Sequence, residues 1–320
     1  MKQIKLFSTA LLGLALAFSS CNLNNDDNEN YQSFTYSVCN LVIPQNGDAP
    51  FAAEDNYVLT YFPYSGNVSV TSSKLSLGVG TTSFTTTQMP YTVKAYGDAA
   101  GMYEVTRFAG GKANENGVAI TDLSGYTSQM VNVLPPNIAT MPGYTFRANP
   151  ALVMSYVANY DYVVKTFKPD AVYNGKTTIV TQGMEGMPYS NENILYRVVF
   201  HTDLKSADII FYNAQFADRM PAINFVVRNL AVTYNKSGYM IGMPQGTQYI
   251  VPEMPEGQSG QYTPYESYRF TTFNFNVSDA QLTTGALNFN IEMVANGQAR
   301  AQYTGMFSGA YVYSGSESGI

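Results

Sequence analysis

The chain has 320 residues, of which 12% are charged and 14% aromatic, with 26 Tyr, 18 Phe, no Trp, one His and two Cys. Few charges together with many Tyr, Phe and Thr favour pleated sheet over helix. A net charge of −6 gives no electrostatic basis for binding nucleic acid. One His and two Cys are too few for a His/Cys zinc site or a pair of haem ligands. We therefore expect an all-β protein with no cofactor, no metal site and no nucleic-acid partner.

Residues 1–20 have the features of a secretory signal. Lys2 and Lys5 supply positive charge, and the apolar run 6–18 suits a signal-peptide core but is too short to span a bilayer. The run ends in Ser-Ser-Cys at Cys21. This ending resembles the lipobox of bacterial lipoproteins. In that family the signal is cleaved before the cysteine, which then carries acyl chains. The resemblance implies lipidation of Cys21 and a membrane anchor made of those chains.

Residues 21–32 are predicted to form a disordered, acidic tether. The sequence NLNNDDNEN, which follows the cysteine, has too little apolar surface to pack. An acidic stretch at this place resembles the surface-export signal of Bacteroidetes lipoproteins, which implies an outer-membrane protein facing the cell exterior. By composition alone, a plain spacer is the alternative. No later segment reaches 18 consecutive apolar residues, so lipid is the only anchor that the sequence predicts.

The rest of the chain shows the two-residue period of half-buried strands. In the segments 273–277 (FNFNV) and 287–293 (LNFNIEM), apolar side chains alternate with polar ones, and the alternation resumes in 299–303 (ARAQY). Asn296-Gly297 separates the last two segments, and this dipeptide is typical of a tight hairpin because both residues tolerate positive φ. These patterns predict antiparallel strands with one face in a core.

Three short segments recur further along the chain in the same order, which predicts an internal duplication. The matches pair Tyr57–Phe62 with Tyr196–His201, Phe84–Pro90 with Phe216–Pro221, and Val157–Asn159 with Val294–Asn296. We expect two similar, tandem domains, 33–167 and 168–320, each an antiparallel β-barrel or β-sandwich. Two long, proline-containing loops are expected at 134–143 and 242–264.

The pattern in each half also resembles the calycin-like, or lipocalin-like, barrels of surface lipoproteins from gut Bacteroidetes. The residues that carry the resemblance are the strand Ala207–Asn213, the segments Phe216–Pro221 and Ala222–Val227, and the hairpin at Asn296-Gly297. The resemblance implies either a barrel interior that holds one ligand or a binding role on the surface. It implies no catalytic residues.

Candidate catalytic groups are few. His201, the only histidine, precedes Asp203 by two residues and could share a strand face with it, but we interpret it as a strand-end histidine with a local hydrogen bond. The G-x-S-x-G match at 315–319 leaves no room for the helix that a nucleophile elbow needs. Paired carboxylates at Glu253 and Glu256 lie in a proline- and glycine-rich loop, so a glycosidase is not favoured.

Other pairs and single residues have simpler interpretations. Asp203 with Asp208 is a second carboxylate pair, and nothing marks either as desolvated. Methionines recur in M-x-x-M-P form at 184–188 and 240–244, and we expect them to fill gaps near loops rather than bind Cu(I). Cys39 lies in a strand-like run and is expected to be a buried thiol.

Three tyrosines, Tyr262, Tyr265 and Tyr268, lie within nine residues and are the predicted ligand-binding patch. The sequence thus predicts a non-catalytic, lipid-anchored cell-surface protein that binds a small ligand, a glycan or a partner protein through loops or a cavity. The alternative is a structural or adhesive, fimbria-like surface subunit. Such a subunit would show an exposed edge strand or a donor-strand groove.

Overall fold

The computed structural model describes residues 31–78, 80–98, 101–132, 151–167, 169–218, 220–255, 261–278, 282 and 284–312. The predicted signal peptide, Cys21 and the expected loop 134–143 lie outside these residues. All regular elements in the described ranges are strands, which confirms the all-β expectation. Within the same ranges, no helix has the length and apolar character needed to cross a membrane.

The strands of the first half form one antiparallel sheet. They are β1 (Gln32–Pro44), β2 (Phe51–Phe62), β3 (Asn67–Ser76), β4 (Thr81–Thr85), β5 (Met89–Asp98), β6 (Gly101–Glu115), β7 (Val118–Asn132), β8 (Ala151–Ala158) and β9 (Tyr162–Phe167). Eight of them pair in chain order, and the pairing of β9 with β1 closes the ring. The ninth, β4, pairs with β3 beside the ring.

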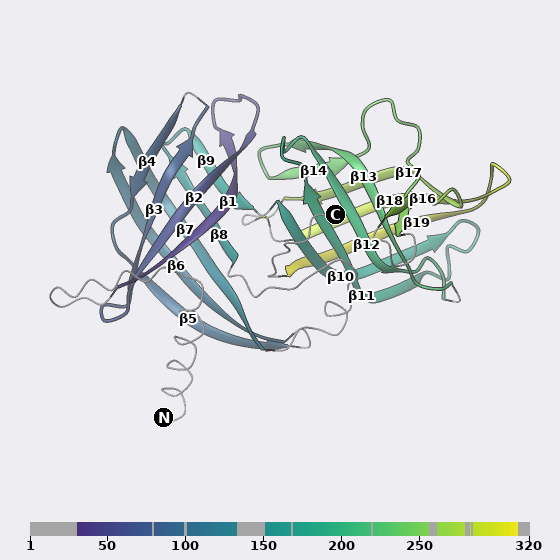
Figure 1. Cartoon of the computed structure of the whole chain (residues 1–320), viewed down its shortest axis with the longest axis horizontal. Helices are drawn as coiled ribbons and strands as arrows, with labels where there is room; N and C mark the ends of the chain where they lie inside the picture. Colours follow the sequence, from purple (N-terminus) through teal and green to yellow (C-terminus); the bar gives the residue numbers. More distant parts are fainter. Residues whose placement is uncertain are drawn as a thin grey trace.

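The second half repeats this plan. Its strands are β10 (Asp170–Thr181), β11 (Tyr189–Phe200), β12 (Ser206–Ala214), β13 (Ile223–Tyr234), β14 (Tyr239–Gly242), β15 (Glu253–Pro255), β16 (Tyr262–Pro264), β17 (Tyr268–Val277), β18 (Thr284–Ala295) and β19 (Gln298–Val312). The pairing of β10 with β19 closes a ring of eight strands, and β15 and β16 form a short hairpin attached to β13. Both halves are therefore closed barrels rather than sandwiches (Figure 1).

Two of the three sequence matches fall on corresponding strands of the two rings, whereas Phe216–Pro221 of the third lies between β12 and β13. The match of Tyr57–Phe62 with Tyr196–His201 begins on the second strand of each ring, β2 and β11. The first tyrosine of each segment lies opposite a tyrosine of the first strand: Tyr57 faces Tyr36, and Tyr196 faces Tyr173. The match of Val157–Asn159 with Val294–Asn296 lies in the β8–β9 and β18–β19 hairpins, which are formed by the last two strands of each ring. This shared order supports our proposal that the halves are an internal repeat, with domain bounds at 33–167 and 168–320.

Alternation along the strands builds each core from one face. Phe273, Phe275 and Val277 are buried while Asn274 between them is exposed, as the two-residue period predicts. The predicted hairpin is also present, with φ of 54° at Asn296 and 73° at Gly297. In the described part of the expected loop at 242–264, the chain forms the short strands β15 and β16 and a single bridge from Ile250 to Phe270.

The two barrels pack side by side (Figure 1). Outward-facing side chains of β1, including Cys39 and Leu41, join the same buried cluster as Phe200 and Tyr239 of the second barrel. Phe167 at the end of β9 lies between them, with its ring centroid 5.2 Å from that of Phe200. β1 thus packs against the second barrel.

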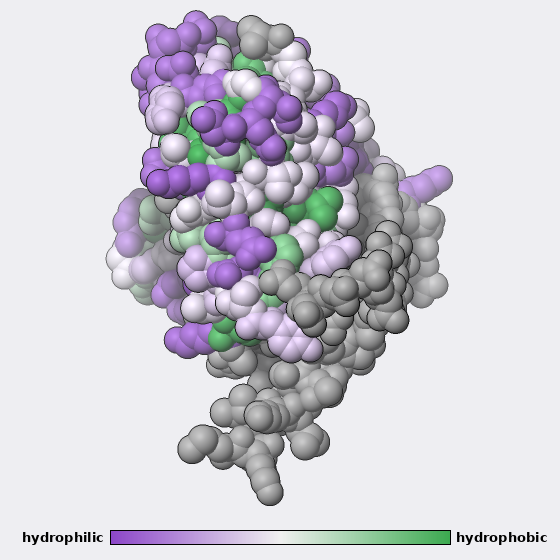
Figure 2. All heavy atoms as spheres, turned by 90° about the vertical axis from the view of Figure 1, so that its left-hand side faces the viewer, coloured by the Kyte–Doolittle hydropathy of each residue, from purple (hydrophilic) through white to green (hydrophobic). Residues whose placement is uncertain are grey.

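The first barrel has a mainly polar surface on the side away from the second barrel. Figure 2 shows this side, where apolar residues are scattered among polar and weakly polar ones. A chain with 12% charged residues covers such a surface with uncharged polar groups, as its composition predicts.

Candidate functional site

The interior of the second barrel is filled by aromatic rings. Phe211 stacks on Phe225 with ring centroids 4.4 Å apart, and Phe307 meets Tyr196 edge-on at 4.4 Å. Gly305 makes room for this packing, because a Cβ at that position would lie 2.1 Å from the ring of Phe289. Any larger residue at 305 would displace that ring.

The interior of the first barrel holds a buried hydrogen-bond network. The hydroxyls of Tyr57 and Tyr156 are 2.8 Å apart, and Asn40 Nδ2 donates to the Tyr57 hydroxyl at 2.9 Å. Asp55 accepts from the hydroxyl of Ser72 at 2.6 Å, and burial raises the pKa of this carboxyl. In the described residues, each barrel is thus occupied by its own side chains. These filled interiors disfavour the interior ligand site that the lipocalin-like resemblance implies and favour a site on an outer face.

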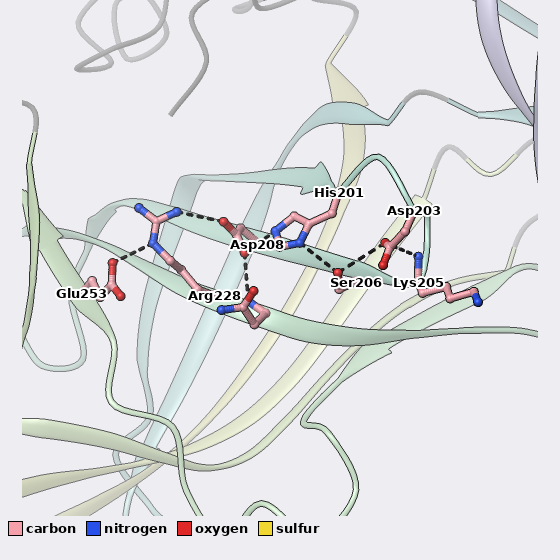
Figure 3. A network of polar contacts seen from close by, with 8 residues as sticks. His201, Asp203, Lys205, Ser206, Asp208, Arg228 and Glu253 are labelled. Carbon is pink, nitrogen blue, oxygen red and sulfur yellow. Dashed lines mark hydrogen bonds and ion pairs between the residues drawn. The ribbon is translucent and has the colours of Figure 1, made fainter.

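A connected set of charged side chains crosses the outer wall of the second barrel (Figure 3). Arg228 on β13 donates from Nη1 to Asp208 Oδ2 at 2.9 Å and from Nε to Glu253 Oε2 at 2.6 Å. Asp208 Oδ1 also accepts from His201 Nε2 at 3.0 Å and from the backbone N–H of Asn229 at 2.9 Å. The set therefore joins β12 and β13 to the end of β11 and to the β15–β16 hairpin.

A β-bulge explains why Asp208 lies at the centre. The pairing of β12 with β13 shifts between Ala207 and Ile209, so Asp208 faces two residues of β13, and one of these, Asn229, has φ of 55°. A bulge leaves a backbone N–H without a ladder partner. The Asp208 carboxylate binds that N–H and so satisfies a group whose burial would otherwise cost free energy.

Ser206 extends the network on the other side of the imidazole. Its Oγ lies 2.8 Å from His201 Nδ1 and 3.4 Å from Asp203 Oδ1. Because a carboxylate only accepts hydrogen bonds, His201 Nε2 donates to Asp208. In the neutral tautomer that this requires, Nδ1 accepts a hydrogen bond from the Ser206 hydroxyl. The sequence suggested Asp203 as the partner of His201, but the carboxylate that binds the ring is Asp208.

This set has the residue types of a nucleophilic triad but not its electrostatics. Asp208 is shared with Arg228 and a backbone N–H, so little of its charge is left to stabilise an imidazolium. Asp203 lies beside the serine, and the backbone N–H of Lys205 lowers the pKa of Asp203, which keeps this carboxyl ionised. A negative charge next to the hydroxyl opposes the oxyanion that acyl transfer forms. We therefore interpret the set as an ionic clamp between strands.

The three predicted tyrosines do not form one exposed patch. Tyr262 is half-buried on β16, with the Arg228 guanidinium 5.1 Å from its ring centroid. Tyr265 is half-buried against Tyr268, with ring centroids 5.4 Å apart. Tyr268 itself is only 7% exposed, and burial raises its pKa to about 12. Tyr268 therefore belongs to the barrel core, and only parts of the other two rings reach the surface.

The outer face of β17, β18 and β19 contains a polar hollow of about 320 Å³. Its lining residues are Gln182, Thr271, Asn290, Ile291, Glu292, Gln302 and Thr304. Thr271 is the extra residue of a second bulge, between the pairs Phe270 with Ile291 and Thr272 with Asn290. Bulges re-aim side chains and are frequent beside binding sites. We call this set the β17–β19 hollow.

Cross-strand contacts fix the side chains around the β17–β19 hollow. Arg269 Nε binds Glu292 Oε2 at 2.5 Å, and Gln302 Nε2 donates to Glu292 Oε1 at 2.9 Å. The Arg269 guanidinium lies 5.4 Å from the ring centroid of Tyr249, which is 49% exposed. Ile250 bridges Phe270 in antiparallel register, and one step along this register places Tyr249 beside Thr271. The hollow is thus flanked by an aromatic ring held on one face by an arginine.

The sequence patterns did not reveal the β17–β19 hollow. Its lining comes from three strands and from the turn after β10, which lie up to 122 positions apart from Gln182 to Thr304. Only the alternation of Asn290 and Glu292 with buried neighbours indicated that these side chains face outward. The bulge at Thr271, which turns this side chain toward the lining residues of β18 and β19, has no signature in a single sequence.

The remaining predicted residues fall in varied places. Cys39 is buried, as expected, and burial raises the pKa of its thiol to about 12, with the nearby Glu54 carboxylate adding to the shift. Met184 and Met187 are exposed in the turn after β10. Glu256 and the G-x-S-x-G match lie outside the described residues. In the described part of the chain, no three His, Cys, Asp or Glu side chains come together as a metal site.

No protein-family model matches the chain, and no curated protein matches it. Among solved structures, the chain is similar to the isotype 1 transferrin binding protein B from serogroup B Neisseria meningitidis, with 9% sequence identity and a TM-score of 0.24. The match covers 81% of this chain and spans 66% of that protein's chain. At this level of similarity, the assignment of two barrels rests on the strand pairings alone.

Proposed function

We propose that this protein is a lipid-anchored cell-surface protein that binds its ligand on the outer face of its second barrel, at the β17–β19 hollow, without catalysis. The observation that carries the proposal is the combination of filled interiors with a preformed polar hollow outside. A hollow of about 320 Å³ falls within the range of about 300 to 1,000 Å³ that small-ligand sites occupy.

The anchor part of the proposal rests on the sequence. The positively charged N-terminus, the apolar run and the Ser-Ser-Cys sequence follow one another in the order that acylation of Cys21 requires. The acidic tether suits exposure on the outer surface of the cell. We expect cells that express the protein to incorporate a palmitate analogue into it, and Cys21→Ala to abolish the incorporation. Protease added to intact cells should digest the wild-type protein. Protection from protease in intact cells would contradict the surface location.

The binding part is tested by filling the hollow. In Thr304→Trp a large ring occupies the space, whereas Met306→Trp places the same ring two residues along the same outward face, beyond the lining residues. The full-length lipoprotein in detergent is tested against arabinoxylan, α-mannan, starch, polygalacturonate, gelatin and serum albumin. We expect binding of at least one of these that Thr304→Trp abolishes and Met306→Trp preserves. Equal binding by both variants would contradict the site.

The structural or adhesive alternative has less support. A donor-strand partner needs an open groove or a long free edge, whereas first and last strands pair in both barrels. Among the described residues, free edges include β4 and β16, of five and three residues, and the part of β5 beyond Pro90, which pairs with β6 alone. Sizing of the purified protein distinguishes the two functions: a monomer fits the binding protein, and chain-like oligomers would fit the adhesive subunit.

A further inference from the structure

Several polar groups that line the β17–β19 hollow have no partner among the described residues. The side chains of Gln182 and Thr271 make no hydrogen bond there, and Asn290 uses its Oδ1 to accept from Thr304 at 2.9 Å while its amide N–H groups stay uncommitted. Gln302 donates to Glu292 but leaves its Oε1 without a donor. The hollow thus offers both donors and acceptors, held in place by the bonds that their other atoms make.

The hollow carries little net charge. Glu292 is the one lining residue that ionises, and its two oxygens bind Arg269 and Gln302. A carboxylate paired in this way has no strong attraction for a cation, and the arginine has none to spare for an anion. Ionic ligands are therefore disfavoured, and a ligand that is neutral and rich in hydrogen-bonding groups fits the lining.

Tyr249 adds an apolar surface next to these polar groups. Its ring is 49% exposed, and the Arg269 guanidinium 5.4 Å from the centroid restrains it. An exposed ring that is already fixed offers contact area at a small cost in conformational entropy. A ligand with an apolar face and a rim of hydroxyl groups would contact the ring and the amides together.

Sugar rings have this combination, because their C–H groups form apolar faces and each hydroxyl both donates and accepts. We propose that the β17–β19 hollow binds a neutral oligosaccharide or polysaccharide, with Tyr249 as the stacking platform and Asn290, Gln302 and Thr271 as hydrogen-bonding groups. This inference rests on the proposed function, because it names the ligand class of the same site.

The test is native gel electrophoresis of the full-length lipoprotein in detergent through gels that contain arabinoxylan, α-mannan or starch. Polygalacturonate serves as the anionic arm, and gelatin and serum albumin, immobilised separately, serve as the protein arm. The variant is Tyr249→Ala, and the matched control is Tyr160→Ala, an exposed tyrosine in the β8–β9 turn of the first barrel.

We expect at least one neutral polysaccharide to retard the wild-type protein and Tyr160→Ala equally. Tyr249→Ala should weaken that binding by at least about 10-fold, or about 1.4 kcal/mol, the loss typical of an aromatic anchor. Binding only to gelatin, serum albumin or polygalacturonate, lost when Thr304→Trp fills the hollow, would overturn the sugar assignment and leave the proposed binding function intact. Polysaccharide binding that Tyr249→Ala leaves unchanged, or the absence of retardation in every neutral gel, would also overturn it.

Discussion

Asp55 is a carboxyl group inside the wall of the first barrel, 3% exposed, at a place where strand pairing is irregular. The pairing of β3 with β4 shifts between Ser72 and Leu75, and Asp55 binds the backbone N–H of Lys74 at 3.0 Å. Asp208 does the same for Asn229 in the second barrel. In both barrels, a buried aspartate thus satisfies the backbone at a bulge.

Burial outweighs these hydrogen bonds at Asp55 and raises the pKa of its carboxyl above the ordinary 3.8. A raised pKa in the folded state means that this group contributes stability below pH 3.8, and that the contribution is lost as the pH rises through the folded-state value. Asn at this position accepts the same N–H bonds and does not titrate.

We therefore expect the free energy of unfolding of Asp55→Asn, relative to the wild type, to increase as the pH is raised from about 3 to 7. Urea unfolding of both proteins at several pH values measures the difference. A difference that is independent of pH across this range, or one that falls as the pH rises, would show that folding does not raise the pKa of the Asp55 carboxyl.

Some residue environments could be predicted from the sequence and others could not. The burial of Cys39 follows from its place in an apolar strand and is confirmed. The partner of His201 could not be predicted, because Asp208 reaches the ring only through the bulge between β12 and β13. Likewise, Tyr268 is buried although its neighbours in sequence suggested an exposed loop.

The β15–β16 hairpin is the element whose attachment depends most on charge. One residue pair, Val226 with Glu253, links it to β13 in the sheet. Arg228 Nε forms an ion pair with Glu253, and the guanidinium lies over the ring of Tyr262. Its Nη1 binds Asp208 on β12. Below the hairpin, Ile210 and other apolar side chains form a small cluster on the outer wall.

Arg228→Met should destabilise the protein by about 3 kcal/mol, because it leaves the buried Asp208 carboxylate without its cation. The matched control is Lys176→Met, which breaks an exposed pair with Glu192 and should cost less than about 1 kcal/mol. Thermal and urea unfolding measure both changes. Equal, small effects of the two variants would contradict the role of Arg228 as a clamp.

At the scale of elements, the sequence predicted the strands well where one face meets water. The segments 273–277 and 287–293 alternate as expected, and the hairpin at Asn296-Gly297 forms. The closing pairs β1–β9 and β10–β19 join strands far apart in the chain, so no local pattern reveals them. Whether each half would be a barrel or a sandwich depends on those pairs.

At the scale of the whole molecule, the two barrels share a buried cluster. Cys39 is 2% exposed within it, and the Lys165 ammonium donates to the Ser237 carbonyl at 3.2 Å across the same boundary. Removing one barrel would expose apolar side chains of the other. We therefore infer that the barrels unfold together rather than separately.

Thiol labelling in urea checks this inference. Because Cys39 is buried and its pKa is raised to about 12, we expect no reaction with an aromatic disulfide reagent in the native protein at pH 8. Labelling should begin at the urea concentration at which the tyrosine fluorescence of both barrels changes. Labelling well below that concentration would mean that the barrels separate before either unfolds.

Both barrel interiors are filled, and we propose that recognition takes place at an outer face of the second barrel. Hydrogen–deuterium exchange of the full-length lipoprotein, alone and with arabinoxylan, α-mannan or starch, tests this most directly. We expect at least one polysaccharide to slow exchange in the strands Tyr268–Val277, Thr284–Ala295 and Gln298–Val312 and to leave the first barrel unchanged. Slowed exchange confined to the first barrel would contradict recognition at this face, and no change with any of the three polysaccharides would contradict the sugar assignment.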